Sequence, residues 1–400
     1  MPRYTPFYSR TSELCQSHSW LEWSGFLAAN MYELHHLREY WAIRTAAGLI
    51  DISPLYKYHL HGRDALKLLN RVVTRDISKL AVGQVLYTPW CDEQGKVIDD
   101  GTLHRLGENL YRLTAADPTL RWLQDNALGL DVQVDDVTEE IAALALQGPL
   151  SRDILDSISN PLISNPLISN LQYYRLTQTT IAGVPATISR TGYTGDLGYE
   201  LWLSPANAER VWDAITEAGQ PYKLRAAGQL ALDMARIEAG LLLVATDFVS
   251  AKKTTFAVQK STPFELGLGW AVKLDKGNFV GREALRKEKE RGPAWATVGL
   301  EVGWESLEGV YRSFRMPIHL PQSAWSVAVP VYADGQHIGK ATSGAWSPLL
   351  KKYIALARLR PEYAQPGAAV NMEVTVEAHR RLAAATVVEL PFFNPERKRA

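Results

Sequence analysis

The feature that most constrains the fold is a glycine-rich turn that leads directly into a short β-strand at residues 190–203, which read RTGYTGDLGYELWL. The glycines at every third position are Gly192, Gly195 and Gly198. They predict a tight turn with exposed backbone, because only glycine takes positive φ without steric cost. Residues 199–203 are β-formers, and a period of two places Glu200 and Trp202 on one face of the predicted strand.

Glu200 is unusual in this setting. A carboxylate beside tryptophan in an apolar strand needs hydrogen-bond donors if it is buried. One interpretation is that Glu200 pairs with an arginine or faces solvent on an edge strand. A second is that it binds a ligand such as a pterin, whose ring N–H and exocyclic amine lie side by side and match two carboxylate oxygens. The spacing alone leaves both interpretations open.

This segment resembles the signature G-Y-T-G-E-x-G-x-E of the glycine cleavage T-protein family, the tetrahydrofolate-dependent aminomethyltransferases. Asp196 stands where the family usually has glutamate. The resemblance implies that Glu200 contacts the pterin of the folate. It also implies that Tyr193 stacks on the folate.

A second matching segment reads as a β-hairpin, with a strand at 85–90, a turn at 92–95 and a strand at 96–103. The period of two places Asp99 and Asp100 on opposite faces, so that only one can face a site. Without further information, an Asp-Asp pair beside a turn is most often a solvated hairpin end. The family's G-G-x-x-D-D motif matches residues 95–100, with lysine replacing the second glycine, and implies that Asp100 is the catalytic acid. The family's pocket tyrosine falls on Tyr87.

A helix is predicted over residues 226–238, with Arg236 in its last turn. A cation at this end of a helix offsets the helix dipole, which is the ordinary structural role. Residues 236–241 resemble the family's L-R-x-E-A-G-L, and this resemblance implies that Arg236 meets the carboxylate tail of the folate.

Further matches extend the resemblance over nearly the whole chain. Residues 145–149 resemble A-L-Q-G-P, and residues 342–352 resemble T-S-G-x-x-S-P-x-L-K-K. Between them, residues 158–170 repeat I-S-N-P-L in tandem, and a five-residue period with proline predicts a surface loop.

The fold class predicted is therefore α+β, an aminomethyltransferase-like folate-binding fold with a C-terminal antiparallel β-barrel domain. A charge-rich run at 286–293 indicates a boundary. We expect a folate-binding region at 1–290, made of two interwoven α+β subdomains with one at roughly 50–140, and a barrel domain at 291–400.

Composition excludes several classes of protein. Lys+Arg and Asp+Glu both number 43, so no charge excess favours nucleic acid or an anionic membrane. The 2 cysteines lie far apart, and adjacent His35 and His36 cannot share a metal alone, so we expect no metal site. The chain has no leader-like segment and no apolar run that could span a bilayer, and we expect a cytoplasmic protein.

The implied activity moves a one-carbon unit from a small donor to N5 of tetrahydrofolate, the expected cofactor. Three departures fall near the family's donor side: Pro54 replaces histidine, Ala116 replaces asparagine and Val244 replaces tyrosine. They favour a demethylase of a small methylated compound. The alternatives are an aminomethyltransferase of the glycine cleavage system acting on a lipoyl carrier protein, a possible partner that these residues do not favour, and a non-catalytic folate-binding protein. The cysteine motif of the family's iron–sulfur assembly relatives is missing at residues 277–283.

Overall fold

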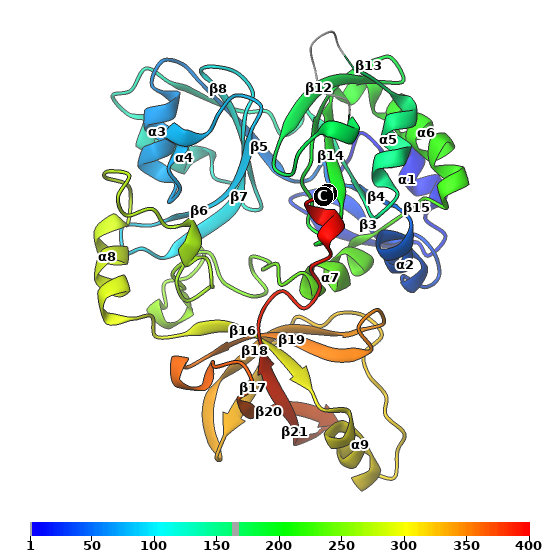
Figure 1. Cartoon of the computed structure of the whole chain (residues 1–400), viewed down its shortest axis with the longest axis vertical. Helices are drawn as coiled ribbons and strands as arrows, with labels where there is room; N and C mark the ends of the chain where they lie inside the picture. The colour runs from blue at the N-terminus through cyan, green and yellow to red at the C-terminus, as the bar shows by residue number, and fades with distance from the viewer. Residues whose placement is uncertain (1, 162–167) are drawn as a thin grey trace. The chain divides into compact units, whose positions relative to one another are not determined.

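The structure is a computed structural model that describes residues 2–161 and 168–400. The chain divides into two compact units. Figure 1 colours the chain by residue number from the N-terminus to the C-terminus. Unit 1 comprises residues 1–88, 99–235 and 395–400, and unit 2 comprises residues 89–98 and 236–394. The division into 1–290 and 291–400, with a subdomain at roughly 50–140, stays a prediction. The prediction of a surface loop for the tandem repeat at 158–170 is wrong for residues 159–161, which form a strand paired with residues 179–181, and residues 162–167 lie outside the described residues.

The elements within the described residues have the following bounds. The α-helices are α1 (Tyr8–Leu14), α2 (Leu37–Thr45), α3 (Ala65–Val72), α4 (Leu120–Ala127), α5 (Ser151–Ile158), α6 (Ala208–Gly219), α7 (Gln229–Glu238), α8 (Arg282–Arg291) and α9 (Trp304–Ser313). The strands up to residue 226 are β1 (Arg3–Tyr4), β2 (Ser19–Trp23), β3 (Phe26–Met31), β4 (Gly48–Asp51), β5 (Tyr56–His61), β6 (Val85–Cys91), β7 (Val97–Arg105), β8 (Leu110–Ala115), β9 (Gln133–Asp136), β10 (Ala142–Gln147), β11 (Ser159–Pro161), β12 (Leu176–Ile181), β13 (Val184–Ser189), β14 (Gly198–Leu203) and β15 (Arg225–Ala226). The strands beyond residue 290 are β16 (Ala296–Val302), β17 (Val329–Ala333), β18 (Gln336–Ser347), β19 (Lys352–Leu359), β20 (Ala369–Val376) and β21 (His379–Val388).

Two sheets of the N-terminal region position the candidate site. Over the described residues, one has seven strands in the order β11-β12-β13-β14-β10-β4-β15, and the other has five in the order β6-β7-β8-β5-β9. The predicted glycine turn leads into β14, which lies between β10 and β13 and places Glu200 opposite Ala145 and Ser189. The predicted hairpin is formed by β6 and β7, and β7 pairs with β8.

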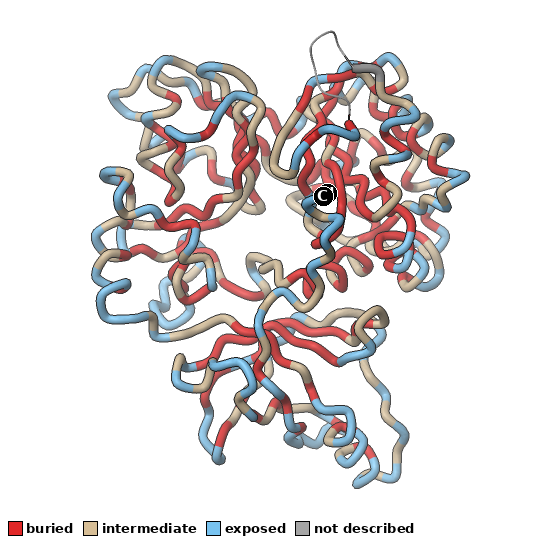
Figure 2. Tube along the Cα trace, in the orientation of Figure 1, coloured by how far each residue is buried: buried red, intermediate tan, exposed pale blue. Residues whose placement is uncertain are grey.

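The alternation predicted for the strand at 199–203 is present in β14. Tyr199, Leu201 and Leu203 enter the hydrophobic core of unit 1, which also includes residues of β10, α5 and α6. Figure 2 shows this region as largely buried. Trp202, on the other face, is also buried, with 2% of its surface exposed. Both faces of β14 are therefore covered. Glu200, on the same face as Trp202, is only partly buried.

Unit 2 contains the predicted antiparallel barrel. In this described region six strands close in the order β16-β19-β18-β17-β20-β21 around a core that includes Leu300, Val331 and Leu359. The T-S-G motif lies on β18, where the hydroxyls of Thr342 and Ser343 both donate to Asp247 Oδ1, at 2.6 and 2.7 Å. Mixed helices and sheets followed by this barrel confirm the α+β class.

In the described part of the chain, none of the helices combines the length and apolar character needed to cross a lipid bilayer. The same residues contain no cluster of three or more His, Cys, Asp or Glu side chains arranged to hold a metal ion.

Candidate functional site

The turn before β14 is held by the side chain of Gln147, the glutamine of the A-L-Q-G-P motif. Its side-chain amide donates to the carbonyls of Thr191 and Tyr199 at 3.2 and 3.3 Å, and its Oε1 accepts the Thr194 hydroxyl at 2.8 Å. Gln147 is fully buried, so these bonds satisfy its polar atoms away from water. One side chain thus fixes the backbone on both sides of the turn.

The glycines of this turn serve two different purposes. Gly195 has φ of +75°, the left-handed conformation that the sequence predicted. Gly192 and Gly198 do not have positive φ, and the positive-φ explanation is wrong for them. A Cβ at Gly192 would lie 1.9 Å from Gln147 Oε1, and one at Gly198 would lie 2.3 Å from the same side chain. These two glycines are required because Gln147 packs directly against the backbone.

Two arginines hold the acidic residue of the turn. Arg397 makes a bidentate bond to Asp196, with Nε and Nη2 at 2.7 and 2.8 Å from its oxygens. The buried Arg44 lies 3.8 Å from Asp196 and donates to the Thr194 carbonyl at 2.8 Å. An aspartate at this position, where the family usually has glutamate, is therefore fully used in ordering the turn.

Glu200 ends a chain of hydrogen bonds. Trp202 Nε1–H donates to Ser189 Oγ at 3.3 Å, Ser189 and Thr191 share a bond of 2.8 Å, and the Thr191 hydroxyl donates to Glu200 Oε2 at 2.7 Å. Burial raises the pKa of Glu200, while the Thr191 hydroxyl and the Arg112 guanidinium oppose that rise. The carboxylate is oriented by neutral donors on its own sheet and faces one cation.

Asp99 and Asp100 point to opposite faces of β7 and have different partners. Asp99 is fully buried, and its Oδ2 accepts the backbone N–H groups of Ala116 and Asp117 at 3.0 and 2.8 Å. Asp100 is only partly buried, and its Oδ2 accepts the Tyr87 hydroxyl at 2.6 Å. Asp99 therefore holds the end of β8, and Asp100 is the member of the pair that a ligand can reach.

Burial raises the pKa of Asp100 to about 6, and the Tyr87 hydroxyl opposes part of that rise. Burial and the neighbouring Asp100 raise the pKa of Asp99, and the backbone N–H groups that bind Asp99 oppose this effect. A carboxyl group that titrates near neutrality can both accept and release a proton at ordinary pH.

Each of the two carboxylates affects the pKa of a tyrosine of unit 1. Tyr193 and Tyr174 both contribute to the raised pKa of Tyr87, after burial and Asp100. The charge of Glu200 in turn contributes to the raised pKa of Tyr174. Four of the residues predicted from the sequence, Tyr87, Asp100, Tyr193 and Glu200, thus lie in unit 1 and each is partly exposed.

Arg236, the fifth predicted residue, belongs to unit 2. It is fully buried, where its guanidinium forms an ion pair with Asp247 and donates to the Leu241 carbonyl at 3.3 Å. The hydroxyls of the T-S-G motif bind the other oxygen of Asp247, so Arg236 belongs to a buried polar network of unit 2. Its contact with a folate tail stays a prediction.

Sequence reasoning did not single out Arg112, Tyr174 or Thr191. Arg112 is a charged residue at an alternate position of an apolar strand, LYRLTA, and this pattern was the available signal. It lies opposite His104 on β7 and His59 on β5, and its guanidinium carbon lies 4.1 Å from the centre of the Trp202 ring.

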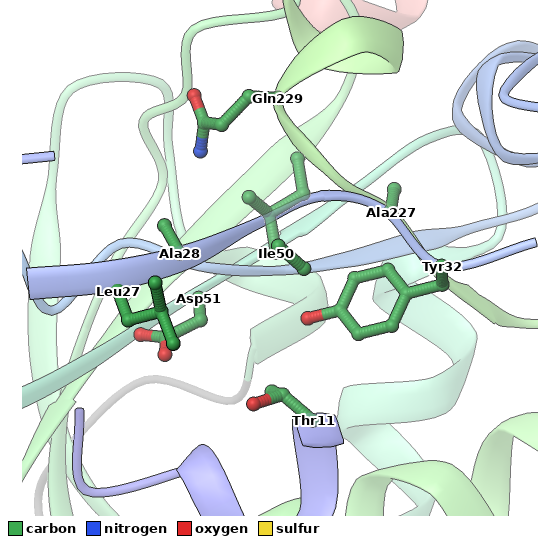
Figure 3. A pocket seen from close by; sticks show the side chains of 9 residues that line it. Thr11, Leu27, Ala28, Tyr32, Ile50, Asp51, Ala227 and Gln229 are labelled. Carbon is green, nitrogen blue, oxygen red and sulfur yellow. The ribbon is translucent and has the colours of Figure 1, made fainter. Parts of the chain in front are cut away.

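A small cavity of about 10 Å³ lies elsewhere in unit 1, between β3, β4 and the start of α7. Figure 3 shows the carboxylate of Asp51 and the hydroxyls of Thr11 and Tyr32 turned toward the same space. Its lining residues are Thr11, Leu27, Ala28, Ala29, Tyr32, Ile50, Asp51, Ala227 and Gln229. This volume is roughly that of one water molecule, so the cavity is not a site for a two-ring heterocycle.

Comparison with known proteins identifies the family of this chain. The GCVT N-terminal domain matches residues 12–276, and the glycine cleavage T-protein C-terminal barrel domain matches residues 318–394. The chain thus has the two-part organisation of GCVT-type proteins. It belongs to the glycine cleavage T-protein family.

Several relatives show how far the similarity extends. An aminomethyltransferase of Halothermothrix orenii is 35% identical over 361 residues, covering 89% of this chain and 91% of that protein. A trimethylamine-oxide aldolase of Ruegeria pomeroyi is 34% identical over 408 residues, covering 100% of this chain and 48% of that protein. The crystal structure of the glycine cleavage system aminomethyltransferase T from Bartonella henselae aligns with a TM-score of 0.80 at 25% identity, covering 98% of this chain and 99% of that one.

Proposed function

We propose that this protein is a tetrahydrofolate-dependent one-carbon transferase that moves a methyl group from a small methylated donor to N5 of tetrahydrofolate. The observation that carries the proposal is that Glu200 and Asp100 are two partly exposed carboxylates of one compact unit, each held by a neighbouring hydroxyl, that of Thr191 and that of Tyr87. Membership of the glycine cleavage T-protein family supports it.

The residues present fit a reduced pterin. Glu200 is a partly buried strand carboxylate whose Oε2 accepts the Thr191 hydroxyl. The ring N–H and exocyclic amine of a pterin would give it two charge-assisted hydrogen bonds. Tyr87 and Tyr193 are partly exposed aromatic side chains in the same unit, and they would pack on the folate rings.

Asp100 would act on the reacting nitrogen. Tetrahydrofolate supplies N5 as the nucleophile when it is bound. Tyr87 fixes the orientation of Asp100 by donating to Oδ2, while Asp99 is committed to the backbone of residues 116–117 and cannot compete for the ligand. Asp100, with its pKa near 6, would stabilise positive charge that develops at N5 or take up its proton.

The residues that replace those on the family's donor side favour a small methylated compound as the donor. Pro54, Ala116 and Val244 replace three polar or aromatic residues of the family. The side chain of Ala116 carries no amide, and its backbone N–H donates to Asp99 Oδ2. The relative named trimethylamine-oxide aldolase, which matches the full length of this chain, is named for a compound that carries methyl groups on nitrogen.

A second candidate is the aminomethyltransferase reaction of the glycine cleavage system, with a lipoyl carrier protein as partner. Two relatives that are matched over most of their own length, 91% and 89%, carry the name aminomethyltransferase and favour it. This candidate requires the chain to accept an aminomethyl group from the carrier without the asparagine that Ala116 replaces.

A product analysis distinguishes the two candidates. The protein is incubated with tetrahydrofolate and a panel of N-, O- and S-methylated small molecules, and in parallel with an aminomethyl-loaded lipoyl carrier protein. Folate products are identified by mass. We expect methyltetrahydrofolate from at least one small donor. Methylenetetrahydrofolate and ammonia from the carrier alone would support the second candidate, and a protein that binds tetrahydrofolate but yields neither product would be a non-catalytic folate-binding protein.

A further inference from the structure

Among the described residues, no carboxylate forms an ion pair with Arg112, a buried arginine of unit 1. Arg112 on β8 is only 3% exposed, and its guanidinium carbon lies 4.1 Å from the centre of the Trp202 ring. Across the described residues, its Nε and Nη2 atoms have no hydrogen-bond acceptor. A buried guanidinium costs free energy unless something compensates its charge, so Arg112 needs an explanation.

Its neighbours on the five-stranded sheet do not compensate the charge. His104 on β7 and His59 on β5 lie directly opposite Arg112. Burial and the Arg112 charge lower the pKa of His59 to about 4 and lower that of His104 well below its ordinary value, so both imidazoles are neutral near pH 7. Lys57, further along β5, is a base that also interacts unfavourably with Arg112.

The compensating charge comes from β14. Burial lowers the pKa of Arg112 to about 9, and Glu200 is the group that opposes this effect. Glu200 in turn faces Arg112 from β8 and the phenol of Tyr174, besides the hydroxyls of Thr191 and Ser189. Arg112 is therefore the cation that favours the charged form of Glu200.

A continuous set of contacts fixes this cation relative to the carboxylate. The guanidinium lies on the Trp202 ring, whose Nε1–H donates to Ser189 Oγ at 3.3 Å. Ser189 bonds to Thr191, which donates to Glu200 Oε2 at 2.7 Å. Trp202 and Glu200 also share one face of β14, so the strand itself sets the separation of the cation and the anion.

We propose that Arg112 is a positioning residue that acts through Glu200: its guanidinium, held on Trp202 and linked to Glu200 through Ser189 and Thr191, is the cation that supports ligand binding by the Glu200 carboxylate. This inference rests on the proposed function, in which Glu200 binds the pterin of tetrahydrofolate. An ionised carboxylate accepts hydrogen bonds at both oxygens, whereas a protonated one presents a donor to the pterin N–H groups.

The need for an ionised Glu200 sets the direction in which tetrahydrofolate affinity changes with pH. A carboxyl whose pKa is raised by burial binds the ligand above that pKa and loses affinity as the pH falls through it. Removing the nearby cation raises the pKa of Glu200 further. The acid limb of tetrahydrofolate affinity therefore moves to higher pH, and affinity recovers at alkaline pH.

The test is the pH dependence of tetrahydrofolate binding by the full chain between pH 5.5 and 9, measured by anaerobic titration calorimetry. Arg112→Gln should move the acid limb upward by about one pH unit, weaken binding on the limb about tenfold, and match the parent at pH 9. Arg112→Lys should restore most of the limb. Arg121→Gln, at an exposed arginine of α4, is the matched control and should leave the profile unchanged.

A second measurement separates a positioning role from a merely structural one. In a Glu200→Gln background the acid limb should disappear, and adding Arg112→Gln should change affinity less than twofold. If Arg112→Gln does not fold, Trp202→Phe takes its place, because it removes the Nε1–H bond and weakens the guanidinium stack, and the same upward shift is expected.

Equal weakening at every pH, or an unmoved limb, would overturn the role of Arg112. A parent protein that does not bind tetrahydrofolate, or one whose affinity does not depend on Glu200, would instead contradict the proposed function. The two failures are therefore distinguishable in one set of titrations.

Discussion

Glu200→Gln is the substitution that most sharply tests ligand binding. It keeps the shape of the side chain and removes its charge, and the Thr191 hydroxyl that bonds to Oε2 at 2.7 Å can still find an acceptor. The new amide nitrogen faces the N–H groups of a pterin with a donor instead of an acceptor. A hydrogen bond to a charged group contributes about 1.5–3 kcal/mol, so the Kd for tetrahydrofolate should rise about 10- to 150-fold.

The assay is anaerobic titration calorimetry at pH 7.5, accompanied by thermal unfolding of each variant. Glu217→Gln, at an exposed glutamate on α6 of the same unit, is the matched control and should keep the parental Kd. A folded Glu200→Gln protein that binds tetrahydrofolate as tightly as the parent would refute the assignment of Glu200 to the pterin.

Three further outcomes are expected. Asp100→Asn should bind tetrahydrofolate within about threefold of the parent and lose roughly 100-fold or more in turnover, measured by steady-state kinetics, since it removes the proton acceptor; parental turnover would exclude a catalytic role. Asp99→Asn should lower the free energy of unfolding by about 2 kcal/mol in urea, because the carboxylate binds the backbone N–H groups of residues 116–117; an unchanged midpoint would contradict this. Burial lowers the pKa of Lys57 from its ordinary 10.5 to about 7, so between these values the unfolded chain binds more protons and the stability of the parent should rise with pH. Lys57→Met should flatten that rise in urea titrations at several pH values, and a slope equal to the parent's would show that Lys57 is not the cause.

Local patterns predicted those parts of the fold that depend on period and turn chemistry. The alternation of residues 199–203 predicted which side chains of β14 share a face, and Gly195 has the positive φ expected of a turn. The opposite faces of Asp99 and Asp100 also follow from the two-residue period of β7, since backbone geometry alone fixes them.

Contacts between segments far apart in the sequence could not be predicted in this way. Gly192 and Gly198 are glycines because Gln147, more than forty residues earlier, packs against them, and no local rule shows that approach. Arg112 appears in the sequence only as a charge in an apolar strand. Its position over Trp202 depends on how two sheets pack, which the period of either strand does not determine.

The most direct test of a folate site at Glu200 and Asp100 is hydrogen exchange of the full chain with and without tetrahydrofolate, followed by mass spectrometry. If Glu200 and Asp100 hold the ligand together, exchange should slow in two separate segments at once, the turn and strand at 190–203 and the strand at 97–105. Protection of neither segment under saturating tetrahydrofolate, or protection confined to other parts of the chain, would contradict a folate site at these carboxylates.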